Sequence, residues 1–173
     1  LEFFELAVAV DPDLPIARGQ RCNALLKLDD ASEEQLKKAE SDCRYLIEWE
    51  PDDSQHPTGL ALALIRMGRL EEGLKSAESI REQFAEDSLY LYNAACAYGR
   101  AIEQLRQTGP DDKSTEADAA HKKRIDEYRD RALADLRGSI KFGLDEFNIE
   151  WMKKDPDLKS IRESPEFEKL FDQ

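Results

Sequence analysis

The stretch DSLYLYNAACAYGRA, residues 87–101, places a run of small residues inside a pattern that is otherwise helical. The run lies between Tyr92 and Tyr98 and consists of Ala94, Ala95, Cys96 and Ala97. Helix cores usually hold bulky side chains, so the run needs an explanation. Either another helix approaches so closely that only a methyl or a thiol fits, or Cys96 is a nucleophile.

The composition favours a helix-rich protein with few turns. The chain has 173 residues, of which 36% are charged, with only 8 Gly and 7 Pro. Its net charge of -13 opposes binding to phosphate backbones and to anionic lipid surfaces, which disfavours nucleic acid and membrane as partners. No run of 18 apolar residues occurs, so the sequence predicts no membrane insertion.

The cysteines and the N-terminus bear on the location of the protein. The three cysteines, Cys22, Cys43 and Cys96, show no disulfide-like spacing, which predicts reduced thiols in the cytoplasm. The N-terminal sequence LEFFELAVAVDPD has neither the basic region nor the cleavage site of a signal peptide. It also lacks an initiator Met, and we therefore expect a piece of a longer protein, whose missing part the sequence does not reveal.

Helical periodicity extends over nearly the whole chain. Ser32 and Gln35 form a capping-box pattern at the start of one helix, and Gly109-Pro110 must interrupt another. The pattern predicts helices at about 2–10, 15–28, 32–50, 55–67, 70–84, 88–107, 115–142 and 145–153, with a turn at 155–157 and a last short helix that begins at Ser164-Pro165-Glu166.

These helices recur in pairs with a repeat length of 34 to 39 residues. The spacing from Pro51 to Ala85 is 34 residues, the length of a tetratricopeptide (TPR) repeat, and Pro12 to Pro51 is 39. The chain resembles the TPR family over residues 1–143 at Phe4, Ala7, Pro12, Cys22, Leu25, Ala39, Leu46, Pro51, Leu60, Ala61, Leu64, Gly68, Ala77, Leu91, Ala94, Ala95, Tyr98, Ala132, Leu136 and Ser139. Arg21 and Cys43 depart from the family pattern, which has an apolar and a bulky residue there.

The resemblance implies an all-α fold, an α-α superhelix of TPR-like helical hairpins with a C-terminal helical cap. The expected organisation is a partial unit at 1–12, repeats at about 14–51, 54–85 and 88–143 with an insertion at about 104–128, and the cap at 144–173. Ala94 and Ala95 fall where paired TPR helices cross most closely. This placement favours close packing as the explanation of the small-residue run, with Ala95 buried against the helix that carries Ala132 and Leu136.

The C-terminal half resembles a narrower group. The segments LYNAACAY, RALADLRGSIKFGLDEF and DPDLKSIRESPEFEKL are similar to the C-terminal TPR region of bacterial eukaryotic-like serine/threonine protein kinases, over about residues 90–171. This resemblance implies association with a kinase. It does not imply kinase activity here, because the chain has no Gly-rich phosphate loop, His-Arg-Asp or Asp-Phe-Gly motif.

No pattern of catalytic or metal-binding residues is found. Activation of Cys96 would need a basic neighbour, and neither His56 nor His121 has a position that suggests one. Cys and His are too scattered for a zinc site. The sequence therefore predicts a protein that is not an enzyme and that needs no cofactor.

In the TPR fold, partners bind mainly in the groove that the first helices of the repeats line. The resemblance places these candidate residues at the groove: Asn23, Leu26, Lys27, Leu62, Ile65, Arg66, Tyr92, Cys96 and Arg100. Three of them, Lys27, Arg66 and Arg100, stand five residues after the small residue of their repeat. They either form a basic edge for an acidic segment or complement the C-terminal dipole of a helix.

Three hypotheses about function follow. The first is a scaffold that binds a protein or peptide, as the docking or regulatory region of a larger bacterial signalling protein. The second is self-association as a homodimer through the helix at 2–10, whose apolar face has no partner in the sequence. The third is an enzyme, which the absence of a catalytic pattern disfavours. The clamp of chaperone-binding TPR proteins is mostly missing, since Gly19, Gly59, Leu89 and Asn93 stand at its positions.

Overall fold

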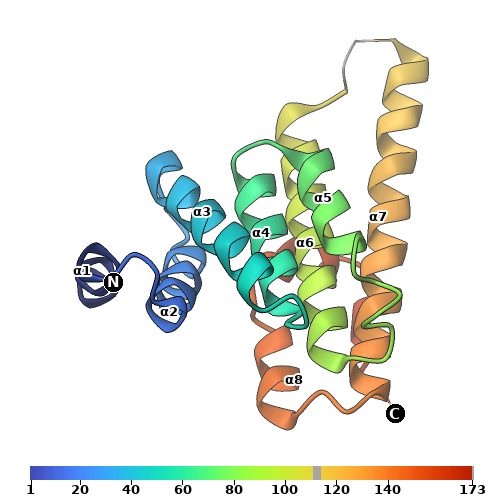
Figure 1. Ribbon diagram of the computed structural model, residues 1–173. Helices are drawn as coiled ribbons and strands as arrows, with labels where there is room; N and C mark the ends of the chain where they lie inside the picture. The colour runs from blue at the N-terminus through green and yellow to red at the C-terminus, as the bar shows by residue number, and fades with distance from the viewer. Residues whose placement is uncertain (111–113, 173) are drawn as a thin grey trace. The chain divides into compact units, whose positions relative to one another are not determined.

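A computed structural model describes residues 1–110 and 114–172, and within these ranges the chain forms helices and turns and no strand (Figure 1). The prediction of an all-α fold of helical hairpins is confirmed. The helices are α1 (Glu2–Val10), α2 (Pro15–Leu26), α3 (Glu33–Trp49), α4 (Gln55–Arg66), α5 (Leu70–Glu78), α6 (Ser88–Thr108), α7 (Thr115–Lys141), α8 (Glu146–Met152), the 3-10 turn η1 (Pro156–Leu158), α9 (Lys159–Arg162) and α10 (Pro165–Glu168).

The helix ends follow the capping residues in the sequence. The backbone N–H of Gln35 donates to Ser32 Oγ at 3.3 Å, and the backbone N–H of Ser32 donates to Gln35 Oε1 at 2.8 Å, so the predicted capping box starts α3. The prediction that the fifth helix continues to residue 84 is wrong, because α5 ends at Glu78. The hydroxyl of Ser79 donates to the carbonyl of Ser76 at 2.7 Å, a local bond that competes with helical pairing.

The chain divides into two compact units. Unit 1 is Leu1–Arg81 and unit 2 begins at Glu82. The boundary that the sequence suggested between repeats and cap, at 143/144, lies inside unit 2. Within the described residues, no helix combines the length and apolar character that crossing a membrane requires.

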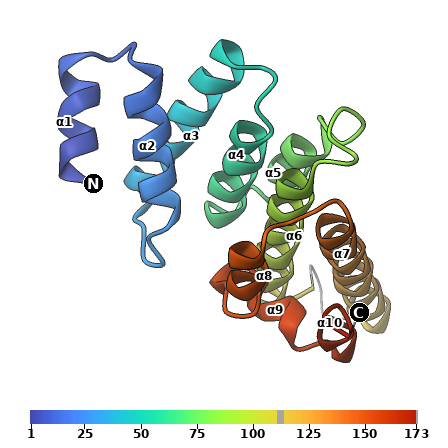
Figure 2. The ribbon, with the colours of Figure 1, turned by 90° about the horizontal axis from the view of Figure 1, so that it is seen from below.

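Unit 1 consists of the hairpins α2–α3 and α4–α5, with α1 packed on α2 (Figure 2). Three helices, α2, α3 and α4, enclose one core, whose buried members are Cys22, Leu25, Ala39, Cys43, Leu60, Ala63 and Leu64. A Cβ atom at Gly59 would lie 3.2 Å from Cys43 Sγ and 3.4 Å from Leu26 Cδ1. The helices α2, α3 and α4 therefore approach one another closely at Gly59, which explains why a small Cys43 fits where a bulky residue was expected.

A buried ion pair in unit 1 explains the other departure from the TPR pattern. Asp42 of α3 is fully buried. Its carboxylate accepts hydrogen bonds from Arg21 Nε and Nη2, both at 2.8 Å, and from Arg18 Nη1 at 2.9 Å. Arg21 thus takes an apolar position because a charge on the facing helix holds its guanidinium.

Unit 2 is built on the hairpin α6–α7. Ala95 is fully buried, as predicted. On the same stripe of α6, Leu91 lies against Gly138 of α7 and the ring of Tyr98 lies 5.5 Å from that of Tyr128. The insertion expected at about 104–128 mostly lengthens the two helices, since α6 runs to Thr108 and α7 starts at Thr115. Residues 111–113 of this insertion are outside the described part of the chain.

The C-terminal cap packs on the same hairpin. It consists of α8, η1, α9 and α10, and η1 and α9 lie against α6. Met152, Leu158 and Ile161 are fully buried, so the cap contributes to the core of unit 2. The predicted last helix begins as expected, with Ser164 Oγ accepting from the backbone N–H of Glu166 at 3.3 Å.

Candidate protein-interaction face

One face of α6 holds a segment of the chain's own C-terminal cap. Tyr92, Cys96 and Arg100 are four residues apart on α6 and therefore share one side of the helix. The hydroxyl of Tyr92 donates to Asp155 Oδ2, and Cys96 Sγ lies 3.8 Å from the same oxygen. Arg100 Nε donates to Asp157 Oδ1. Three of the predicted groove residues are thus brought together, and they contact a peptide segment.

The segment lies directly on the backbone of α6. A Cβ atom at Gly99 would stand closer than 3.0 Å to the carbonyl oxygen of Asp157, a distance that real Cβ atoms essentially never show. The hydroxyl of Ser160 donates to the carbonyl of Gly99 at 2.7 Å. Gly99 is therefore required for the close approach of the two backbones.

The carboxylate of Asp155 is buried and has donors on both oxygens. Besides Tyr92, the indole Nε1 of Trp151 donates to Asp155 Oδ2 at 2.9 Å. The backbone N–H of Asp157 donates to Asp155 Oδ1 at 2.9 Å, and the guanidinium of Arg162 donates to the carbonyl of Asp155. These bonds compensate the burial of the carboxylate and fix the turn that carries Asp157.

The thiol of Cys96 is protected from ionisation. Burial, together with the negative charge of Asp155, raises the pKa of the Cys96 thiol well above its ordinary value. Burial likewise raises the pKa of the Tyr92 hydroxyl. A nucleophilic cysteine needs the opposite shift, so the geometry here suits packing and not attack on a substrate.

Among residues 1–110 and 114–172, two groups of side chains bring potential metal ligands within 4.8 Å of one another. In the first, Cys96, Asp155 and Asp157, the oxygens already accept hydrogen bonds from Tyr92 and Arg100. In the second, His56 Nε2 lies 3.1 Å from Glu50 Oε2 and 3.7 Å from Asp53 Oδ2, at the connection of α3 and α4. In both groups, hydrogen bonds that stabilise the local structure explain why these side chains lie close together.

In unit 1 the predicted groove residues lie on α2 and α4. Asn23 and Lys27 are exposed, Leu26 and Leu62 are half-buried, and Ile65 is buried. The guanidinium of Arg66 donates to the carbonyls of Leu26 at 2.9 Å, Leu28 at 2.5 Å and Asp29 at 3.2 Å. Arg66 therefore binds the last carbonyl of α2 and two carbonyls of the loop that follows it, in the preceding hairpin.

The three bases of the predicted basic edge consequently have different surroundings. Arg66 supports α2, Arg100 binds Asp157, and Lys27 is exposed at the end of α2. The sequence reasoning missed Gly99, Asp155 and Asp157. A glycine inside a helical pattern could have indicated close backbone approach at residue 99, whereas no local pattern links residues 155 and 157 to α6.

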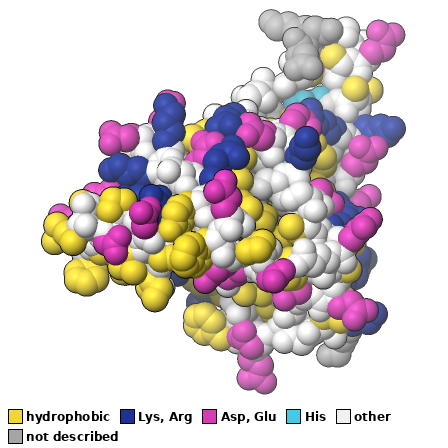
Figure 3. Space-filling view, viewed as in Figure 1, with side chains coloured by type: hydrophobic (Ala, Val, Ile, Leu, Met, Phe, Trp, Pro, Cys, Tyr) yellow, Lys and Arg dark blue, Asp and Glu magenta, His cyan; other side chains and the backbone are white. Residues whose placement is uncertain are grey.

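An apolar surface lies elsewhere in unit 1. Phe3, Leu6 and Val10 form one stripe on α1, with 76%, 65% and 78% of their surface exposed, and Ile16 at the start of α2 is exposed to 76%. Figure 3 shows hydrophobic side chains gathered over α1 and α2. This surface, the α1 stripe with Ile16, is the exposed apolar face that the sequence predicted for the first helix.

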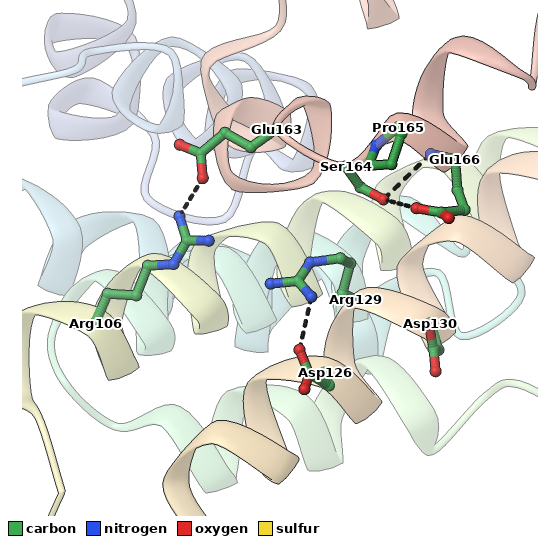
Figure 4. A pocket seen from close by; sticks show the side chains of 8 residues that line it. All are labelled: Arg106, Asp126, Arg129, Asp130, Glu163, Ser164, Pro165 and Glu166. Carbon is green, nitrogen blue, oxygen red and sulfur yellow. Dashed lines mark hydrogen bonds and ion pairs between the residues drawn. The ribbon is translucent and has the colours of Figure 1, made fainter. Parts of the chain in front are cut away.

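Unit 2 also has an open pocket of about 560 Å³ between α6, α7 and the start of α10 (Figure 4). Its lining holds two arginines and four carboxylates, and each arginine pairs with one carboxylate. Arg106 Nη1 lies 2.7 Å from Glu163 Oε2, and Arg129 Nη1 lies 2.7 Å from Asp126 Oδ1. The other two lining carboxylates, Asp130 and Glu166, give the pocket an excess of negative charge.

Comparison with known proteins adds no assignment: no protein-family model matches the chain, and no curated protein matches it either.

Proposed function

We propose that this chain is a non-catalytic scaffold for protein–protein interaction, and that its binding face is the exposed side of α2 and α4 in unit 1. The observation that carries the proposal is the seating of residues 155–158 on α6 through Tyr92, Gly99 and Arg100. There, the first helix of a hairpin binds a peptide segment of the same chain.

The faces of α2 and α4 correspond to that of α6 by position. Each helix has a small residue at the reference position: Cys22 on α2, Ala61 on α4 and Ala95 on α6. The residues that follow directly are Asn23, Leu62 and Cys96, respectively. The residues five positions after the reference are Lys27, Arg66 and Arg100, respectively. On α6 these positions are covered by the cap. In unit 1, Asn23 and Lys27 are exposed and Leu62 is half-buried, so the corresponding face remains accessible.

The wider setting is an extension of the same proposal. The resemblance of the C-terminal half to kinase-associated TPR regions supports a docking or regulatory role in a larger bacterial signalling protein. The three cysteines are free thiols, and all are buried, which fits a reducing compartment such as the cytoplasm.

Site-specific photo-crosslinking in cells tests the binding face. A benzophenone amino acid at Asn23 is expected to give one discrete adduct with a partner protein. The same group at Glu34, exposed on α3, serves as the matched control and is expected to give none. Equal adducts from both positions, or no adduct from position 23 while the protein is folded, would contradict the proposed face.

The α1 stripe with Ile16 favours a second candidate function, self-association into a homodimer. Three large side chains exposed to more than 60% on one helix face are unusual for a surface that stays in water. The mass in solution, measured by light scattering over a wide range of protein concentration, would then double at high concentration. Leu6→Glu is expected to keep the protein monomeric, and a monomer at every concentration would exclude this candidate.

A further inference from the structure

Acidic residues are distributed unevenly between the two helices of each hairpin. The chain has 38 Asp and Glu, yet none occurs in residues 14–28, 54–70 or 88–102. These ranges contain α2, α4 and most of α6, the first helices of the three hairpins. The second helices α3, α5 and α7 each carry acids in their first turn. In a chain of net charge -13, these three stretches of first helix carry no carboxylate side chain.

Burial alone does not explain this pattern in unit 1. Gln20, Asn23 and Lys27 are exposed on α2, and Gln55 is exposed on α4. Exposed helical positions tolerate Glu at no cost in helix propensity, and elsewhere the chain uses it freely. Amide side chains and one lysine stand at these four positions instead, so together they carry one positive charge and no negative charge.

Unit 2 indicates what such a face accepts. The segment seated on the acid-free part of α6 carries two carboxylates, Asp155 and Asp157, followed by the buried Leu158. Asp157 binds Arg100, the base that stands five residues after Ala95. The matching base on α2 is Lys27, five residues after Cys22.

From this charge complementarity, and resting on the proposed function, we propose that the α2–α4 face binds an acidic protein segment in which a carboxylate is followed by an apolar side chain. The carboxylate binds Lys27, and the apolar side chain packs on Leu26 and Leu62, which are half-buried on adjacent helices. The amide of Asn23 is exposed beside them and is suited to hydrogen-bond the backbone of the segment.

The partner is a protein segment and not a nucleic acid. A phosphate backbone is a long polyanion that needs many cations in a row, and the α2–α4 face offers one exposed lysine in a chain with an excess of acids. A short segment with one or two carboxylates meets Lys27 without bringing further negative charge near α3 and α5.

Binding of a defined peptide to the full chain tests this proposal. The probe carries the sequence Asp-Pro-Asp-Leu of residues 155–158 between neutral Gly-Ser flanks, with a fluorophore and a photo-crosslinking group. A second peptide has both Asp replaced by Asn. We expect saturable binding of the acidic probe, cross-links on α2 or α4, binding at least about tenfold weaker for the Asn peptide, and weakening by added salt.

Matched charge reversals in the protein complete the test. Lys27→Glu is expected to weaken binding of the acidic probe by about tenfold or more, and to leave the Asn peptide unchanged. Lys75→Glu makes the same change of charge at an exposed position on α5 and is expected to change binding less than about twofold.

Each other result overturns the inference. Equal binding of the acidic and Asn peptides, with no effect of Lys27→Glu, would show that the face does not select carboxylates, while the proposed function would stand. Cross-links on α6 would show exchange with the chain's own cap. Absence of binding by the acidic probe would also reject the inference, and the photo-crosslinking at Asn23 would still decide on the proposed function. Tighter binding of a single-stranded oligonucleotide would assign the face to phosphate instead.

Discussion

Arg100 and Asp157 are separated by 57 positions in the chain, and their side chains form an ion pair on α6. The pair is mostly shielded from water, with 18% of the arginine side chain and 22% of the aspartate side chain exposed. It attaches the cap to α6 at the place where the two backbones approach most closely.

Removing either partner of this pair should destabilise unit 2. We expect Arg100→Ala and Asp157→Ala each to lower the free energy of unfolding by about 1–3 kcal/mol, because the remaining charge keeps its partial burial without its partner. The double variant should cost less than the sum of the two single variants. Urea denaturation followed by circular dichroism measures all three. Arg106→Ala, which breaks the exposed pair with Glu163, is the control and should cost less than about 1 kcal/mol.

Two glycines inside helices should respond oppositely to the same substitution. Gly99→Ala places a Cβ against the carbonyl of Asp157 and should cost at least about 2 kcal/mol, despite the better helix propensity of alanine. At Gly19 the new Cβ would lie 3.8 Å from Leu46 Cδ1, an ordinary contact, so Gly19→Ala should stabilise by roughly 0.5–1 kcal/mol. Equal shifts in thermal midpoint for both variants would contradict the close approach at Gly99.

The buried carboxylate of unit 1 should be sensitive to loss of its charge. Asp42→Asn keeps the shape of the side chain but leaves Arg18 and Arg21 without a compensating anion, and we expect a loss of about 2–4 kcal/mol. Glu48→Gln changes charge in the same way at an exposed position of α3 and should stay within about 0.5 kcal/mol. Urea midpoints that agree for the two variants would argue against the network.

Stability should fall in alkaline solution. The pKa values of the Cys96 thiol and the Tyr92 hydroxyl are raised in the folded state by burial, so both groups stay protonated there while their unfolded counterparts ionise. The unfolded state therefore gains stability as the pH rises above the ordinary thiol pKa of about 8.5, and the Cys96 thiol then costs the fold about 1.4 kcal/mol at pH 9.5. Below that pKa both groups are protonated in the folded and in the unfolded state, so they cause no loss of folding stability there.

Urea midpoints between neutral and alkaline pH measure this effect. Cys96→Ala should make the decline that begins near the thiol pKa less steep, and leave the contributions of Tyr92 and of the Cys43 thiol, whose pKa is also raised in the folded state. In the native state Cys96 should also resist alkylation until denaturant is added, because the thiolate is scarce and the sulfur is buried. Rapid alkylation of folded protein would contradict the raised pKa.

The sequence predicted local structure well because local structure depends on neighbours in the chain. The capping box at Ser32, the cap at Ser164 and the buried position of Ala95 all rest on spacings of a few residues. The end of α5 was misplaced because the helical pattern of the sequence continues past Glu78, where the hydroxyl of Ser79 bonds to the carbonyl of Ser76. Such competition between side chain and backbone leaves little trace in periodicity.

The candidate site was predicted in part. The resemblance to TPR repeats placed Tyr92, Cys96 and Arg100 on one face, and the structure brings them together on α6. It could not reveal that Asp155 and Asp157 cover them, because contacts between distant segments depend on the packed fold. The role of Arg66 was hidden for the same reason, since its acceptors belong to the preceding hairpin and not to its own helix.

The seating of residues 155–158 on α6 has a consequence for synthesis of the protein on the ribosome. The residues that cover Tyr92, Cys96 and Gly99 are translated about 60 residues after them, whereas the core of α2, α3 and α4 is complete in sequence by residue 66. During elongation this face of α6 therefore stays uncovered until residues 155–160 have left the ribosome. Premature termination before residue 155 should thus yield a product with this face open, a natural target for chaperones and proteases.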